Sequence, residues 1–154
     1  MAKTSLRSSR FISYLVATFL GAFNDNAFKL VVSMASLSMF TDITAQQRYL
    51  SITSALAILP FVLCSGYAGY LADRYRKSNV LRISKAAEIL AMGAALAVFM
   101  TGQSITHLLA TLFLLALHSA FFSPSKYGIL PEILAPADLP KANGYLNMLT
   151  FLAI

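Results

Sequence analysis

The chain has 154 residues, of which 58% are hydrophobic and 12% are charged, and its mean hydropathy is +0.69. Soluble domains carry about 25% charged residues, so this composition excludes an ordinary soluble globular protein. The net charge of +6 does not require nucleic acid, because basic loops of a membrane protein explain it, and we expect no nucleic-acid partner. The single cysteine, Cys64, excludes a disulfide framework or a cysteine metal site.

Long uncharged segments predict an all-α integral membrane protein. Residues 49–72 contain no charged residue, and residues 89–125 contain only two histidines as ionisable groups, while about 20 residues cross a bilayer. We expect helical spans at about 11–40, 50–71, 79–100 and 105–126, and the start of a fifth at about 143–154, still helical at the last residue. Pro60 lies within the second span and should bend it.

The basic residues separate into two groups when they are sorted by the loops between these spans. Nine fall before the first span and around the second and fourth connections, namely Lys3, Arg7, Arg10, Arg74, Arg76, Lys77, Arg82, Lys126 and Lys141. Arg48 alone falls on the opposite side. Because cytoplasmic loops carry the excess of Lys and Arg, this division predicts a multi-pass protein with a cytoplasmic N-terminus.

The first span contains charged and amide side chains deep in the membrane. Asp25 lies about 21 Å along the helix from Phe11, at ~1.5 Å per residue, between Asn24 and Asn26. Lys29 follows Asp25 by four residues, on the same face of the helix. An ion pair between these two, or a lysine that extends to the interface, would explain the charges structurally. The two additional amides favour a polar cavity instead, because an unpaired amide in hydrocarbon is unfavourable.

The third span repeats this arrangement with Lys85 and Glu88, which are three residues apart and can also pair. The four charges of the two spans would together cost on the order of 10 kcal/mol if they faced lipid. We therefore expect them to face protein or water, and we place them among the candidate substrate-binding residues.

The fourth span ends in a polar segment that includes Lys126. Proximity to the helix C-terminus and the cytoplasmic interface would explain a lysine there, and the alternative is a cation that binds an anion at the cytoplasmic mouth of the cavity. His107 and His118 are expected to be hydrogen-bonded structural residues. The sequence contains no catalytic, cofactor or metal motif, so we expect this segment not to be an enzyme.

The loop after the second span, GYLADRYRKSNVL, resembles the signature of the major facilitator superfamily between helices two and three. Gly69, Asp73 and Arg74 match the signature and Lys77 supplies a following base, whereas Arg76 replaces a glycine. The resemblance implies that these residues form a gating motif on the cytoplasmic side. It also implies that residues 1–154 are the N-terminal part of a helical bundle with two halves, and that the native protein is longer.

Three further segments narrow the resemblance: FLGAFNDNAFK in the first span, FFSPSKYGILPE after the fourth, and KANGYLNM before the fifth. Together with SGYAGYLAD they are similar to bacterial lysophospholipid transporters, including forms fused to an acyltransferase and acyl-carrier-protein synthetase. The resemblance implies movement of lysophospholipid to the inner leaflet of the bacterial inner membrane for reacylation. Its partners would be membrane lipids, the remaining helices and an acyltransferase.

The charges agree with an amphipathic substrate of this kind. Asp25 would bind an ammonium, Lys126 a phosphate, and Phe23, Phe28 and Phe122 would line an apolar path for the acyl chain. Two alternatives stay open: a proton-coupled facilitator for a drug or small solute, and the membrane portion of a fused phospholipid acyltransferase.

Overall fold

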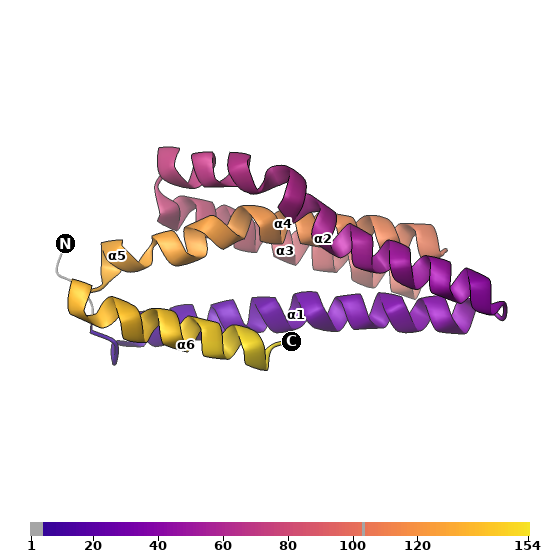
Figure 1. Cartoon of the computed structure of the whole chain (residues 1–154), viewed down its shortest axis with the longest axis horizontal. Helices are drawn as coiled ribbons and strands as arrows, with labels where there is room; N and C mark the ends of the chain where they lie inside the picture. The colour runs from indigo at the N-terminus through magenta and orange to yellow at the C-terminus, as the bar shows by residue number, and fades with distance from the viewer. Residues whose placement is uncertain (1–4, 103) are drawn as a thin grey trace.

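The computed structural model describes residues 5–102 and 104–154 and contains only helices in that part of the chain (Figure 1). The elements are α1 (Ser9–Met39), α2 (Ile43–Arg74), α3 (Lys77–Met100), α4 (Ile105–Gly128), α5 (Leu130–Ile133), the 3-10 turn η1 (Pro136–Asp138) and α6 (Leu139–Leu152). The first four helices are long and apolar enough to cross a membrane. The expected all-α membrane bundle is confirmed, and the chain is a multi-pass membrane protein.

All the expected helices except α4 begin earlier than the hydropathy pattern suggested, and α2 and α6 differ most from the expected bounds. Helix α2 starts at Ile43 rather than at residue 50, because the side chain of Asp42 accepts a hydrogen bond from the backbone N–H of Ala45 at 2.9 Å. Helix α6 starts at Leu139 rather than near residue 143. Pro140 lies in its first turn, where a backbone N–H has no partner within the helix and proline is therefore tolerated. Its last residue is Leu152, so it ends before the position that we expected.

Helix α2 changes direction part-way along its length, and its C-terminal half diverges from α1 (Figure 1). Pro60 is buried within this helix, where its ring removes one backbone hydrogen bond. The bend lets the first half of α2 pack beside α4 while the second half extends away from α1.

Helix α4 is the centre of the bundle and contacts α1, α2 and α3. Two clusters of buried apolar residues hold the helices together. One includes Val32 of α1, Ala95 of α3 and Leu112 of α4, and the other includes Phe11 of α1 and Leu146 of α6. Along α1, Phe11 and Val32 are separated by about six helical turns, at 3.6 residues per turn. The polar residues of the first span lie between them.

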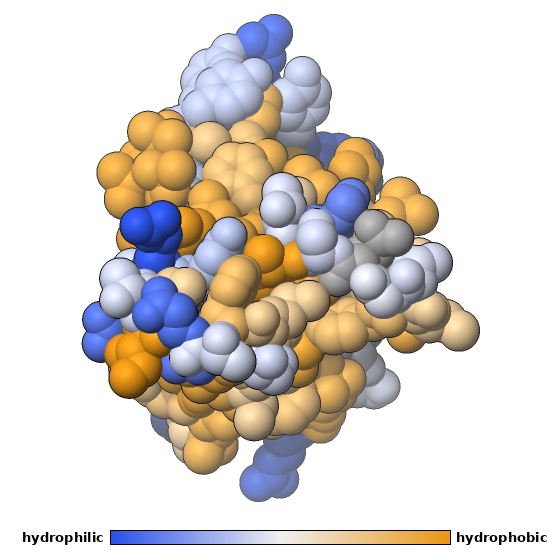
Figure 2. All heavy atoms as spheres, turned by 90° about the vertical axis from the view of Figure 1, so that its right-hand side faces the viewer, coloured by the Kyte–Doolittle hydropathy of each residue, from blue (hydrophilic) through white to orange (hydrophobic). Residues whose placement is uncertain are grey.

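The connections alternate between the two ends of the bundle. The beginning of α1, the α2–α3 connection and α5 lie at one end, and the α1–α2 connection, the end of α3 and the beginning of α4 lie at the other (Figure 1). Of the nine basic residues expected on one side, Lys3 lies outside the described residues. Figure 2 looks at the second end and shows apolar residues reaching the surface around much of its outline. Large exposed apolar side chains, such as Leu63 at 68% and Leu90 at 75%, are typical of surfaces that face lipid or further helices.

Candidate functional site

A cavity of about 350 Å³ lies between the two apolar clusters. It is lined by residues of α1, α2, α3, α4 and α6, so every long helix contributes to it. Its polar and charged lining residues are Thr18, Asp25, Asn26, Lys29, Lys85, Glu88, His118, Ser119, Ser123, Lys126, Tyr127 and Thr150. The fold thus gathers six of the seven predicted substrate-binding residues around one space. The seventh, Asn24, is partly exposed and is not among the lining residues.

Asp25 is held by α4 rather than by its own helix. The hydroxyl of Ser119 donates to Oδ2 of Asp25, and Oδ1 is buried without a hydrogen-bond partner. The possible pair of Asp25 with Lys29 is therefore not formed, because the carboxylate is directed across to α4. The side chain of Asn26 donates to the backbone carbonyl of Ala22 at 2.9 Å, which satisfies the amide without a ligand.

The second predicted pair is present and is mostly buried. Nζ of Lys85 lies 2.5 Å from Oε2 of Glu88, and the two side chains are 30% and 10% exposed. The same ammonium lies 4.8 Å from the centre of the Phe122 ring. Its third neighbour is the backbone of α1 at Gly21, where a Cβ atom would collide with Nζ of Lys85. The glycine therefore allows α3 to bring an ion pair directly against α1.

His118 was expected to be a hydrogen-bonded structural residue, and this expectation is wrong. Its side chain is 6% exposed, and neither ring nitrogen has a hydrogen-bond partner. Nε2 lies 3.9 Å from Oε2 of Glu88, which is too far for a hydrogen bond, and the ring stacks on Phe122 with centroids 6.0 Å apart. The imidazole is thus fixed in place with its polar atoms free. His107, in contrast, lies 3.1 Å from the hydroxyl of Ser104.

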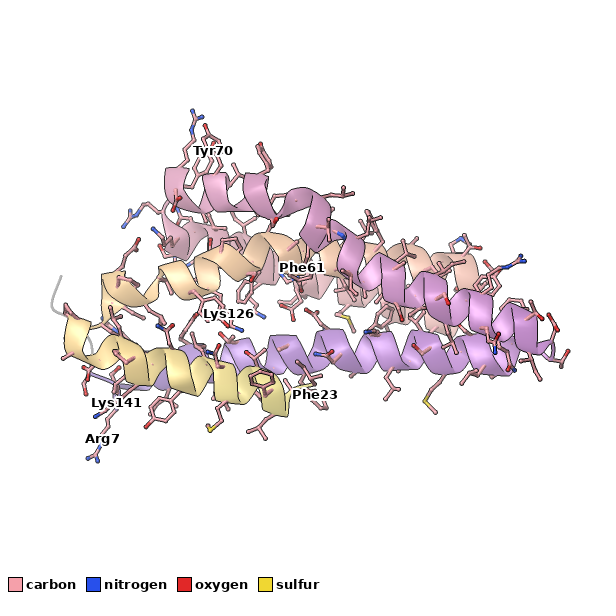
Figure 3. The ribbon with its side chains drawn as sticks, in the orientation of Figure 1. Arg7, Phe23, Phe61, Tyr70, Lys126 and Lys141 are labelled. Atoms are coloured by element: carbon pink, nitrogen blue, oxygen red, sulfur yellow. The ribbon has the colours of Figure 1, made fainter. Side chains whose placement is uncertain are left out.

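Its position near a helix end suggested that Lys126 could extend to the interface, but the side chain does not do so. The residue is 7% exposed, and its Nζ donates to the hydroxyl of Thr150 at 2.8 Å. Its backbone carbonyl accepts a hydrogen bond from the hydroxyl of Tyr14 at 2.5 Å. Figure 3 shows the side chain on the face of α4 that is turned toward α1 and α6. The two contacts enclose the lysine because α1 and α6 cover that end of α4.

The apolar lining differs from the expected one. Phe122 lines the cavity, but Phe28 is buried in the cluster of α1, α3 and α4, and Phe23 lies on the side of α1 away from α4 (Figure 3). Helix α2 instead supplies Phe61 and Ile58. No residue spacing within α1 could have revealed this, because the bend in α2 decides which of its side chains reach the cavity.

The residues of the signature loop lie at the end of the bundle where α1 begins. Lys77 forms an ion pair with Glu132 of α5 at 3.0 Å. Arg74 donates to the hydroxyl of Tyr70 at 2.5 Å, whereas Asp73 is exposed and has no ion pair within the described residues. Gly69 is partly exposed, with no atom near its absent Cβ. In this conformation the ion pair of the signature loop thus joins Lys77 to α5, and Asp73 and Arg74 do not pair with each other.

Comparison with known proteins assigns the family. The model of the Major Facilitator Superfamily matches residues 14–154. The chain belongs to the major facilitator superfamily. Members of this superfamily have two halves that rock against each other around a central site.

Individual superfamily members are also similar to this chain. A protein named lysophospholipid transporter LplT from Cronobacter sakazakii is 29% identical over 150 residues, which cover 97% of this chain and 35% of that protein. The protein of the same name from Escherichia coli strain SE11 is 30% identical over 151 residues, covering 98% and 35%. The chain spans about a third of the length of the curated relatives that it matches. No solved structure matches the chain.

Proposed function

We propose that this chain forms the N-terminal part of a transporter that moves lysophospholipids across the bacterial inner membrane by alternating access. The similar proteins are named lysophospholipid transporters, and the similarity extends over nearly the whole chain. The observation that carries the proposal is the cavity, which combines charges of both signs with an apolar wall. A lysophospholipid has a charged head group and one acyl chain, so its chemistry is complementary to such a lining.

Two cavity residues are proposed to bind the charges of the head group. Oδ1 of Asp25 is a buried acceptor without a partner and can receive an ammonium. Lys126 supplies a buried ammonium that can exchange its neutral partner, Thr150, for a phosphate. Phe61 and Phe122 are proposed to accompany the first part of the acyl chain. The two contacts with the charges of the head group are stronger in a cavity than in water, because the local dielectric constant is lower.

The proposed orientation places the N-terminus in the cytoplasm. The bundle end that carries the beginning of α1 and the α2–α3 connection also carries most of the basic residues among those described. The positive-inside rule assigns such an end to the cytoplasm. Gly69, Asp73, Arg74 and Lys77 would then form a gating motif at the cytoplasmic ends of the helices.

Uptake into proteoliposomes tests the proposal. The complete transporter that contains this chain is reconstituted, and the entry of radiolabelled lysophosphatidylethanolamine is measured for Asp25→Asn and Lys126→Met. Both variants should lose at least about tenfold in uptake, because each charge-assisted hydrogen bond contributes about 1.5–3 kcal/mol. Lys141→Met is the matched control, since Lys141 is exposed outside the cavity. Unimpaired uptake by both cavity variants would remove Asp25 and Lys126 from the site.

The product of this transport defines the next reaction. A lysophospholipid in the inner leaflet becomes a bilayer lipid only when its free hydroxyl is acylated, so we propose delivery to an acyltransferase, either fused or separate. The alternative of a proton-coupled solute facilitator makes a different prediction for the same vesicles. In that case a proton gradient would drive solute entry, and lysophospholipid uptake would be absent.

A further inference from the structure

The ion pair of α3 is built like an ammonium-binding site that already contains an ammonium. Nζ of Lys85 contacts a carboxylate oxygen of Glu88 at 2.5 Å, faces the ring of Phe122 at 4.8 Å, and fits into the space left by Gly21. A carboxylate together with an aromatic face is a typical environment for a bound ammonium group. The ammonium itself stands at the end of a flexible side chain that is 30% exposed, so it can leave.

The surroundings contain more acceptors than one ammonium can satisfy. Oδ1 of Asp25 is buried without a partner, and the hydroxyl of Ser119 occupies only the other oxygen. His118 directly precedes this serine in α4. Its side chain is 94% buried, and neither of its ring nitrogens has a hydrogen-bond partner. Its Nε2 is 3.9 Å from Glu88. A neutral imidazole has one acceptor nitrogen. Asp25, Glu88 and His118 therefore provide several acceptors for one additional hydrogen-bond donor.

We propose that Asp25, Glu88, His118 and Phe122 form the binding subsite for the primary ammonium of the substrate, and that Lys85 fills it while the cavity is empty. This inference rests on the proposed lysophospholipid substrate and deepens it. The acidic subsite keeps a cation in both states, because the substrate ammonium replaces the lysine ammonium. The carboxylate of Glu88 is then not left buried without a counter-charge in either state, which would be strongly unfavourable.

The displaced lysine has a second role in this exchange. A lysine released from Glu88 remains in the cavity, whose lining also contains Lys126. When the substrate ammonium binds the acidic subsite, the negative charge of the substrate phosphate is no longer balanced within the lipid. Lys85 can therefore pair with the phosphate when the substrate ammonium takes its place. One internal ion pair and one zwitterion are converted into two ion pairs between protein and substrate, with no change in net charge.

The proposal predicts that removal of Lys85 affects head groups differently. Lysophosphatidylethanolamine carries a primary ammonium, whereas lysophosphatidylglycerol carries none but has the same phosphate and acyl chain. Equilibrium binding of both radiolabelled lipids to the purified complete transporter gives the ratio of their Kd values. In Lys85→Met the acidic subsite is vacant, so this ratio should shift toward the ethanolamine lipid by about tenfold or more, the size of one charge-assisted hydrogen bond. Free ethanolamine should also compete better with the lipid in this variant.

Two further variants separate the subsite from general charge effects. Lys85→Met combined with Glu88→Gln removes both charges of the pair and should return the ratio to within about threefold of the starting protein. Lys141→Met removes a lysine that is exposed outside the cavity, and it should leave the ratio unchanged.

The outcomes distinguish this inference from the proposed function. A transporter that binds neither lipid contradicts both. A transporter that binds both lipids, with Kd values that Lys85→Met changes by the same factor, contradicts the ammonium subsite alone. A ratio that shifts equally in Lys141→Met also contradicts it, because the effect would then come from the total charge of the protein.

Discussion

The ion pair of Lys85 and Glu88 allows a quantitative test of the site in the absence of any substrate. The two side chains differ in exposure, at 30% for the lysine and 10% for the glutamate. Lys85→Met leaves a buried carboxylate without its counter-charge, whereas Glu88→Gln leaves an ammonium that can rotate toward the open side of the cavity. Their effects on stability should therefore be unequal.

The structure sets the approximate magnitudes. Breaking a fully buried pair by removing one partner costs about 3–5 kcal/mol, and the partial exposure of the lysine reduces this to about 2–3 kcal/mol for Lys85→Met. Glu88→Gln should cost about 1 kcal/mol, since a glutamine still accepts a hydrogen bond from the lysine. The double variant should be less destabilised than the sum of the single variants by about 1–2 kcal/mol, because it leaves no buried charge unpaired.

The free energy of unfolding of the purified complete transporter in mixed micelles provides the measurement. Three variants and the starting protein form a double-mutant cycle, with the same cycle on the exposed pair of Lys77 and Glu132 as the control. That control should give a coupling of about 0–1 kcal/mol that decreases with salt. Additive effects of the two cavity substitutions, or a larger loss from Glu88→Gln than from Lys85→Met, would refute the reasoning.

Three further predictions follow from individual contacts. Gly21→Ala places a methyl group against the ion pair of α3 and should lower the unfolding free energy by about 1–2 kcal/mol, whereas Gly93→Ala, with nothing near its Cβ position, should raise it by up to about 1 kcal/mol; equal effects in thermal unfolding would contradict the close contact at α1. Lys77→Glu should reduce substrate uptake in vesicles, and the added exchange Glu132→Lys should restore it, while a double variant as slow as the single one would argue against the pair. Thr150→Val removes the hydroxyl that accepts from a buried ammonium and should lower stability by about 1–3 kcal/mol, so an unchanged Tm would show that this contact contributes little.

Some residues of the site could be predicted from the sequence, because a charge inside the membrane is unfavourable wherever it occurs. This energetic argument selected Asp25, Lys85 and Glu88 without knowledge of the fold, and all three line the same cavity. The i,i+3 spacing also anticipated the pair of Lys85 with Glu88, because such a pair needs only local helix geometry.

The same local argument failed for Asp25. An i,i+4 partner was available in Lys29, yet the carboxylate is hydrogen-bonded to Ser119, which is 94 residues away in the chain. The spacing of residues in one helix predicts possible partners within that helix. Only the packing between helices decides whether a side chain of a neighbouring helix lies closer to the carboxylate. Thr150 gave no signal in the sequence at all, because a threonine in a helix usually bonds to its own backbone, as its hydroxyl also does here, to Leu146.

Composition, helix periodicity and the placement of charge determined by themselves that this chain is a membrane-spanning helical protein with a polar interior. These properties depend on the transfer of side chains between water and hydrocarbon, which each residue carries wherever the chain folds. Only the tertiary structure decided which polar groups of different helices meet. The bend at Pro60, the close approach at Gly21 and the position of α6 bring side chains from five helices around one cavity, and such contacts depend on packing between segments that are distant in the sequence.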